Sequence, residues 1–306
     1  MRAIWSFWSL PYARHYHHAW AEERYHLLSW VLSVHSVGRF FDSRALHTDS
    51  AGARLLVDTL GLPFDEVHTD LDLLDAADSE WWALGKLHTY RKQQSAFLHF
   101  DSDVYLWQAL KPELLEADLL TQNPDPPLGS SSFYHPHAIE TLLAGAPDTW
   151  LPEAWRWFRQ QPQQHGECCG VFGGQQLAFI HAYADDAIKL VEHPGNQQAW
   201  PQLPQRRVHN VLIEQFLLAA HIARRQAGVN QAPLNVAHIF PDQTAAFAPD
   251  AGQKSGYTHL IAEAKHDPAM LRRLAARVER DYPAHYARAL SAAKHHPAHR
   301  LTELVA

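Results

Sequence analysis

Two aspartates that directly follow an apolar segment are the residues of this chain whose types and spacing could do chemistry. The segment Phe97-Leu98-His99-Phe100 is typical of a short buried strand, and Asp101 and Asp103 follow it. Because side chains alternate faces along a strand, both carboxylates are expected to point the same way, with Ser102 opposite. Such a pair is a hard anionic site suited to Mg²⁺ or Mn²⁺, and an ion bound there would hold a diphosphate.

The spacing alone is weak, because the chain has a second Asp-x-Asp pair at Asp70 and Asp72. That pair has no apolar run before it and lies in an acidic stretch, which predicts a solvated loop. Even for Asp101 and Asp103 there is an alternative, in which the carboxylates only end a strand or cap the next element. Context therefore favours Asp101 and Asp103 over Asp70 and Asp72 as the ligand-binding pair.

The composition is that of an ordinary soluble globular protein. Of the 306 residues, 46% are hydrophobic and 19% are charged, and the net charge of -7 argues against general nucleic-acid binding. No apolar stretch reaches the roughly 18–20 residues that span a bilayer, and the N-terminus does not resemble a signal peptide. Cys168 and Cys169 are adjacent, which favours two reduced thiols. We therefore expect a cytoplasmic protein without a transmembrane segment.

Elements that alternate between strand and helix would position the carboxylates. Strands are expected at 3–9, 44–48, 64–69, 97–100 and 235–240, and helices at 20–35, 50–60, 80–93, 176–192, 207–226 and 267–294, the last interrupted at Pro283. Loops and short helices are expected over 121–164. This order predicts an α/β fold with a mostly parallel sheet flanked by helices and a helical C-terminal part. Ligands of such sheets bind at the carboxyl ends of the strands, where Asp101 and Asp103 fall.

Several further segments follow one another in an order that is informative. They are Leu28-Ser29-Trp30-Val31-Leu32-Ser33, Leu46-His47-Thr48-Asp49, Trp82-Ala83-Leu84-Gly85-Lys86-Leu87, Asp101-Ser102-Asp103-Val104, Gly170-Val171-Phe172-Gly173-Gly174, Glu214-Gln215 and Tyr257-Thr258-His259-Leu260. Together they resemble the GT-A-type glycosyltransferases, the nucleotide-sugar-dependent class with an Asp-x-Asp metal site. The chain is similar to capsular-polysaccharide-type transferases and to uncharacterised bacterial domains of this type. His259 lacks the Gly and Lys-Pro-Trp pattern that follows the late histidine of the best-known families.

The resemblance implies a single Rossmann-type GT-A-like domain over 1–306, with a nucleotide-binding half at about 1–120 and an acceptor-side half at about 121–306. It implies a metal-dependent glycosyltransferase with a nucleotide-diphosphate sugar as donor and a saccharide or other hydroxyl compound as acceptor. The cofactor would be Mn²⁺ or Mg²⁺. Asp103 would bind the ion directly, Asp101 would contact the ribose or the ion through water, and His259 would complete the ligand set.

Other residues would bind the donor. Thr48 and Asp49 end a strand near the expected nucleotide pocket, although Asp49 could equally cap the next helix. Lys86 could contact a phosphate, with a surface lysine as the alternative. Gly173 and Gly174 could allow close approach of a sugar, or they could only form a tight turn.

The catalytic base is the least determined assignment. Glu214 lies in an apolar helical segment, and a pocket there would raise its pKa and suit it to deprotonate an acceptor hydroxyl. Asp185 and Asp186 are the competing candidates.

Two other functions fit part of the pattern. A nucleotidyltransferase would share the sheet and the metal but needs a glycine-rich basic loop after the first strand, and residues 9–14 contain no glycine. The third possibility is a sugar- or nucleotide-binding module without turnover.

Overall fold

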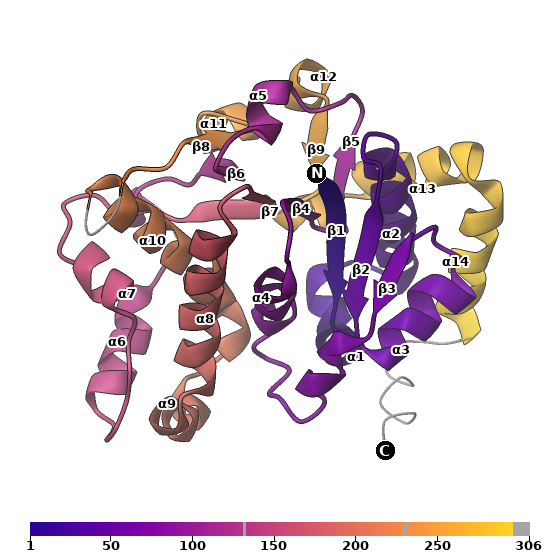
Figure 1. The fold of residues 1–306 in the computed structure, drawn as a ribbon. Coiled ribbons are helices and arrows are strands. Elements are labelled where there is room, and N and C mark those ends of the chain that lie inside the picture. Colours follow the sequence, from indigo (N-terminus) through magenta and orange to yellow (C-terminus); the bar gives the residue numbers. More distant parts are fainter. Residues whose placement is uncertain (131–132, 229–231, 296–306) are drawn as a thin grey trace. The chain divides into compact units, whose positions relative to one another are not determined.

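The computed structural model describes residues 1–130, 133–228 and 232–295, which form two compact units (Figure 1). The first unit contains Met1–Ser79, Phe97–Lys111 and the chain from Pro249 onward. The second contains Glu80–Ala96 and Pro112–Ala248. Each unit has its own buried core.

Parallel strands form the centre of the first unit. β1 (Arg2–Phe7) pairs with β2 (Arg44–Thr48) on one side and with β4 (Phe97–Phe100) on the other. β3 (Glu66–His68) adds to the outer edge of β2. All of these pairings are parallel, so the carboxyl ends of the strands share one edge. The near-continuous apolar sequence of β1 and β4 agrees with strands that are buried on both faces.

Helix α2 (Glu23–Gly38) is the main helix packed in this unit. It contacts α13 (Pro268–Asp281) and α14 (Pro283–His295), which lie beside it in Figure 1. Because α2 is enclosed, it buries serines as well as apolar side chains. The other elements of this unit are α1 (Ser9–Ala19), α3 (Ser50–Ala53), a π-helical segment η1 (Arg54–Thr59), the 3₁₀ segments η2 (Asp70–Leu74) and η7 (Ala262–Lys265), and α12 (Ala251–Ser255).

A small antiparallel ladder completes the first unit. β5 (Val104–Leu106) follows β4 after a turn and pairs with β9 (Tyr257–His259). The register places Val104 opposite His259. A segment more than 150 residues later in the chain is thereby brought to the end of β4.

The strands of the second unit are mixed in direction. β6 (Leu119–Pro124) pairs antiparallel with β7 (Glu167–Gly174) and parallel with β8 (Val236–His238). The first residue of β7 therefore lies at the same end as the last residues of β6 and β8. Cys168 and Cys169, the second and third residues of β7, are buried and are not joined in a disulfide.

Helices pack around these strands. α4 (Ala83–Lys92) contacts α8 (Leu177–Glu192), and α7 (Glu153–Phe158) contacts α10 (Leu217–Gln226). The other elements are α5 (Pro112–Leu115), η3 (Leu128–Ser130), α6 (Pro136–Ala144), α9 (Pro194–Ala199), η4 (Trp200–Gln202), η5 (Arg206–His209), the π-helical η6 (Leu212–Phe216) and α11 (Gln243–Ala246).

The predicted α/β class with mostly parallel strands and flanking helices is confirmed, and so is the helical C-terminal part with its break at Pro283. No helix among the described residues is both long and apolar enough to cross a membrane. The GT-A assignment stays a prediction, as does a single domain with halves at 1–120 and 121–306.

Some local predictions were wrong. The 121–164 stretch holds most of β6, which escaped notice because buried polar residues (Thr121, Gln122 and Asn123) occupy positions that are usually apolar in a core strand. Helix α1 and the β5–β9 ladder were also missed. The helix expected over 207–226 consists of 3₁₀, π and α segments.

Gly174, predicted to approach a sugar, is packed tightly against backbone. Its φ is +140°, and a Cβ would lie 2.2 Å from the carbonyl oxygen of Asp118. We expect Gly174→Ala to lower the free energy of unfolding by about 2 kcal/mol or more, because the backbone cannot yield as a side chain can. Chemical denaturation measures this loss. Gly145→Ala is the matched control, since its Cβ would meet only atoms at 3.6 Å. Equal stability of the two variants would contradict the prediction.

Candidate metal centre

Asp101 and Asp103 lie in the turn that joins β4 to β5. The amide of Val104 donates to the carbonyl of Asp101 at 3.0 Å, which closes a four-residue turn. Our expectation that strand pleating aligns the two carboxylates was therefore wrong. They share a side because the chain turns, and the turn stands at the carboxyl end of β4 as predicted.

Buried serines of α2 fix the backbone of this turn. Ser29 Oγ donates to the carbonyl of Ser102 at 2.7 Å, and Ser33 Oγ donates to the carbonyl of Asp101 at 3.2 Å. Ser33 Oγ also accepts from Trp5 Nε1 at 3.0 Å, which connects the turn to β1. The serines lie four residues apart and therefore share one face of the helix.

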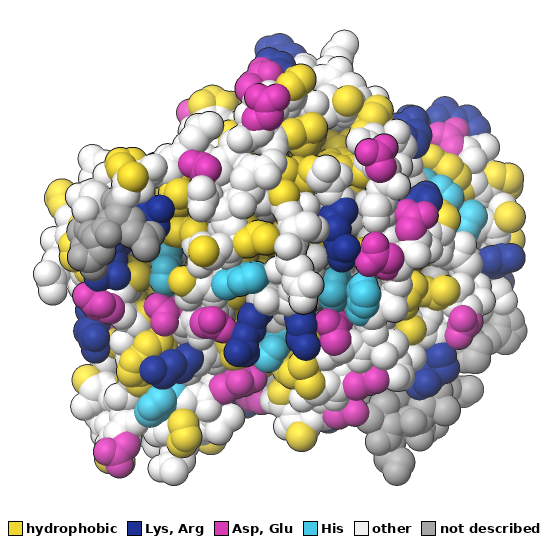
Figure 2. Space-filling view, in the orientation of Figure 1, with side chains coloured by type: hydrophobic (Ala, Val, Ile, Leu, Met, Phe, Trp, Pro, Cys, Tyr) yellow, Lys and Arg dark blue, Asp and Glu magenta, His cyan; other side chains and the backbone are white. Residues whose placement is uncertain are grey.

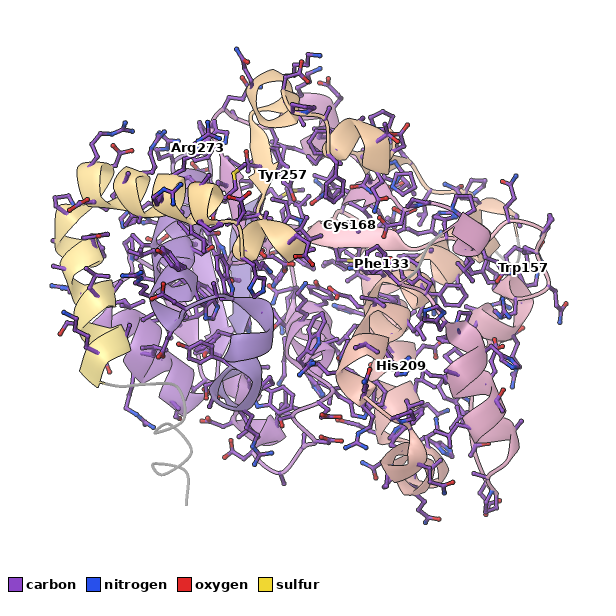
Figure 3. All side chains as sticks on the ribbon, turned by 180° about the vertical axis from the view of Figure 1, so that it is seen from behind. Phe133, Trp157, Cys168, His209, Tyr257 and Arg273 are labelled. Carbon is purple, nitrogen blue, oxygen red and sulfur yellow. The ribbon has the colours of Figure 1, made fainter. Side chains whose placement is uncertain are left out.

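His259 reaches the turn through the ladder of β5 with β9, whose first residue, Tyr257, is labelled in Figure 3. The amide of Leu260 donates to the carbonyl of Asp103 at 2.9 Å. His259 Nε2 then lies 3.3 Å from Asp103 Oδ1. Strand pairing thus brings His259 to the two aspartates, which the local turn already holds together.

Asp101, Asp103 and His259 each offer an atom that lies within 4.8 Å of the others, and they are the only such group among the described residues. Two carboxylate oxygens and one imidazole nitrogen form a donor set that suits Mn²⁺ and is compatible with Mg²⁺. The side chains therefore fit the predicted cation in both spacing and chemistry.

Lys265, a residue that our sequence interpretation missed, joins this cluster. Its Nζ lies 2.5 Å from Asp103 Oδ2 and 5.4 Å from the centre of the Trp20 ring. Burial opposes ionisation of Asp103, but the charges of Lys265 and His259 outweigh it and hold the pKa of that carboxyl far below its usual value. Asp103 is thus a buried anion whose charge is compensated.

His26, whose ring centre lies 5.9 Å from that of Trp20, does not add to the positive charge. Burial, together with the charge of Lys265, lowers the pKa of His26 to about 3, although Asp103 acts in the opposite direction. His26 Nε2 accepts from Trp30 Nε1 at 3.1 Å, as a neutral ring with its proton on Nδ1 can.

Thr48 and Asp49 make local hydrogen bonds. Thr48 Oγ1 donates to the carbonyl of Phe7 at 2.6 Å. Asp49 caps α3 by accepting from the amide of Gly52, and its second oxygen accepts from the amide and hydroxyl of Ser9. Burial raises the pKa of Asp49 against these hydrogen bonds. This is the capping alternative, and contact of Thr48 or Asp49 with a nucleotide stays a prediction.

Asp70 and Asp72 do not lie in a solvated loop as expected. They belong to the 3₁₀ segment η2. Asp72 accepts from the amide and the hydroxyl of Ser50, both at 2.6 Å, and Asp70 lies 3.1 Å from His47 Nδ1. The second Asp-x-Asp pair therefore anchors the start of α3 and the end of β2.

In the second unit, Lys86 and Glu214 form an ion pair. Lys86 Nζ donates to Glu214 Oε1 at 2.8 Å, and the carboxylate is wholly buried. Tyr183 Oη donates to the backbone carbonyl of Glu214 at 2.7 Å. Breaking such a pair leaves a charge buried, which costs about 3–5 kcal/mol. The structural role is clear, while a phosphate contact for Lys86 and a base role for Glu214 stay predictions.

The other base candidates lie on α8. Asp185 is half exposed and pairs with Arg91 Nε at 2.8 Å, and Asp186 lies 3.2 Å from His221 Nε2. Gly173 and Gly174 end β7, fully buried. No sugar contact or proton transfer follows from these positions alone, so these roles also stay predictions.

A polar cluster around Glu167 was missed by the sequence interpretation. The residue before Cys168 (labelled in Figure 3), Glu167 begins β7 and is almost fully buried. One oxygen lies 3.3 Å from His165 Nε2, and the other lies 3.1 Å from His238 Nε2 and 2.8 Å from Thr121 Oγ1. Burial raises the pKa of Glu167, but hydrogen bonds with both histidines outweigh this effect and bring it to about 2.

These missed residues had weak local signals. Serines spaced by four within an apolar helix, as at Ser29 and Ser33, indicate a buried polar contact. Lys265 and Glu167 have no pattern around them that would have singled them out. On the face seen in Figure 2, histidines also lie among both acidic and basic side chains.

Comparison with known proteins gives one family. Its sequence model, described as a family of unknown function (DUF6734), matches residues 1–292. No curated protein matches the chain.

The hydroxyl of Ser33 is predicted to stabilise the turn that carries the carboxylates. Ser33→Ala removes the partner of Trp5 Nε1 and one partner of the Asp101 carbonyl, which should lower the free energy of unfolding by about 1–3 kcal/mol. Urea denaturation would measure the change. Ser95→Ala, at an exposed serine, should change stability by less than about 0.5 kcal/mol. A Ser33→Ala variant as stable as this control would refute the role.

Glu167 should make stability depend on acid pH. Because folding lowers the pKa of Glu167 from 4.5 to about 2, its ionised carboxylate stabilises the folded state by about 3 kcal/mol above pH 4.5. This contribution is lost as the pH falls from 4.5 towards 2. Glu167→Gln should therefore flatten the stability profile in that window, measured by denaturation at a series of pH values. Glu153→Gln is the control, because Glu153 is largely exposed in its pair with Arg224. Parallel profiles for wild type and Glu167→Gln would exclude this contribution.

Proposed function

We propose that this chain, which belongs to that family of unknown function, is a metal-dependent glycosyltransferase. It would transfer a sugar from a nucleotide-diphosphate donor to the hydroxyl of a saccharide or another acceptor. The observation that carries the proposal is the convergence of Asp101, Asp103 and His259 at the carboxyl end of β4.

The place of the cluster in its unit supports a ligand site. Parallel α/β sheets bind ligands outside the carboxyl ends of their strands, and the turn from β4 to β5 lies there. The backbone carbonyls of Asp101 and Ser102 accept hydrogen bonds from Ser29, Ser33 and Val104, which hold the turn that carries the carboxylates in place. This rigid backbone is what a preorganised site requires.

Within the proposal, each side chain has a distinct task. Asp103 would hold a Mn²⁺ or Mg²⁺ ion through Oδ1, with His259 Nε2 beside it and Asp101 contacting the ion or the ribose. The ion would supply Lewis-acid stabilisation to the departing nucleoside diphosphate. The bond from the anomeric carbon to the phosphate oxygen breaks with its electron pair on that oxygen, while the acceptor oxygen bonds to the carbon and loses its proton.

The test is titration calorimetry of the full chain with UDP and with GDP, in the presence and absence of Mn²⁺. We expect binding that depends on Mn²⁺ and that weakens on the order of 100-fold or more in Asp103→Asn, because a neutral amide replaces the anionic carboxylate ligand. Asp250→Asn is the control, since Asp250 forms an exposed ion pair with Lys254. Binding of neither nucleotide in a metal-dependent way would refute the proposal.

Turnover distinguishes the proposed enzyme from a binding module. With a nucleotide-diphosphate sugar and Mn²⁺, the enzyme should release nucleoside diphosphate slowly to water, whereas a binding module would gain heat stability and release none. A nucleotidyltransferase would instead release pyrophosphate from a nucleoside triphosphate. Either of these results would replace glycosyl transfer as the function.

A further inference from the structure

Lys265 holds one oxygen of Asp103 while the other oxygen faces His259. The ammonium lies 2.5 Å from Oδ2, and His259 Nε2 lies 3.3 Å from Oδ1. The lysine is fixed in turn, because its carbonyl accepts from the amide of Ala21 at 3.3 Å and its ammonium lies 5.4 Å from the centre of the Trp20 ring. The Lys265 ammonium group is thus paired with Asp103, a predicted metal ligand.

We propose that Lys265 weakens the binding of a divalent cation when no diphosphate is present, so that the cation binds together with a diphosphate group rather than alone. The inference rests on the proposed function, since it concerns the affinity of the same metal site. It assigns to Lys265 a regulatory role that neither the sequence pattern nor the family match provides.

The charges of the cluster support this role. Asp101 and Asp103 carry two negative charges, a ligating His259 is neutral, and Lys265 removes one of the negative charges. The neighbouring His26 hydrogen-bonds as a neutral ring and adds none. A divalent ion entering alone would leave a net positive charge beside a lysine, in a place where water screens poorly. A diphosphate brings two or more negative charges and offsets that excess.

The geometry allows the lysine and the ion to be present together. A carboxylate has two oxygens, and Lys265 contacts Oδ2 while Oδ1 faces His259. Lys265 therefore need not leave when an ion binds, and its charge acts on the ion in the bound state. A lysine that only filled the site before the ion entered would have to give up this contact.

Linkage gives the inference a measurable form. If the diphosphate strengthens ion binding by some factor, the ion strengthens diphosphate binding by the same factor. Removing the charge of Lys265 should make the ion alone bind more tightly and should reduce that factor. A lysine that only orients Asp103 would, when removed, weaken ion binding instead.

The experiment measures Mn²⁺ affinity of the full chain, with and without saturating UDP. Electron paramagnetic resonance counts free Mn²⁺, and a series with UDP and no protein corrects for ions bound in solution. For Lys265→Met we expect Mn²⁺ alone to bind on the order of tenfold more tightly, and the strengthening by UDP to fall by a similar factor. Lys254→Met is the matched control and should behave as wild type, because Lys254 pairs with Asp250 at the surface.

The outcomes separate this inference from the proposed function. If wild type binds no Mn²⁺ with or without UDP, the metal site itself fails. If wild type binds Mn²⁺ and Lys265→Met has unchanged or weaker affinity for Mn²⁺ alone, the inference is overturned and the metal site stands. If Lys265→Met does not fold, the same titrations are made with Lys265→Gln, which removes the charge but keeps a hydrogen-bond donor for Asp103. Lys265→Arg, which keeps the charge, should retain the wild-type strengthening by UDP.

Discussion

An ionised carboxylate buried at the end of β4 is the constraint on which the candidate site depends. Asp103 is almost completely removed from water, and an isolated charge in such a place is strongly unfavourable. It is compatible with the fold because β9 delivers His259 to one oxygen and η7 delivers Lys265 to the other. The β4–β5 turn places the Asp103 charge in the interior, and the C-terminal part of the first unit supplies the two side chains that compensate it.

The backbone of that turn imposes a second requirement, which α2 meets. Carbonyl groups at a buried turn need donors, and an entirely apolar helix would provide none. Ser29 and Ser33 supply hydroxyls at the level of the turn, while the apolar side chains around them complete the core. Because Ser33 also accepts from Trp5, the turn, the helix and the first strand are linked by one hydroxyl.

The same rule organises the second unit. Glu167 is held by His165, His238 and Thr121, and Glu214 is held by Lys86. In both cases the carboxylate is buried, and the basic side chains that pair with it are more exposed to water. These are His165 and His238 for Glu167, and Lys86 for Glu214. The polar Thr121 of β6 is tolerated in the core for this reason, since it donates to Glu167.

The sequence could predict features that arise from neighbouring residues. Apolar runs, their spacing and the breaks between them gave the α/β class, the exact extent of β2 and β4, and a break of the C-terminal helix at Pro283. The position of Asp101 and Asp103 directly after a strand was sufficient to place the candidate site at the end of β4. Features that depend on partners far along the chain were missed, including β6, where the buried Thr121 donates to Glu167 on the adjacent strand.

The sequence by itself therefore determined the class of fold, the carboxylates and their place at a strand end, because each follows from local periodicity. Only the tertiary structure decided how Asp101 and Asp103 converge, since a turn rather than strand pleating brings them together. It also decided which distant residues join them. His259 arrives through its register with Val104, and Lys265 follows from the next short segment. The sequence offered His259 as a candidate ligand, but strand register and charge compensation are long-range, so only the tertiary structure showed that His259 reaches Asp103 and that Lys265 joins it.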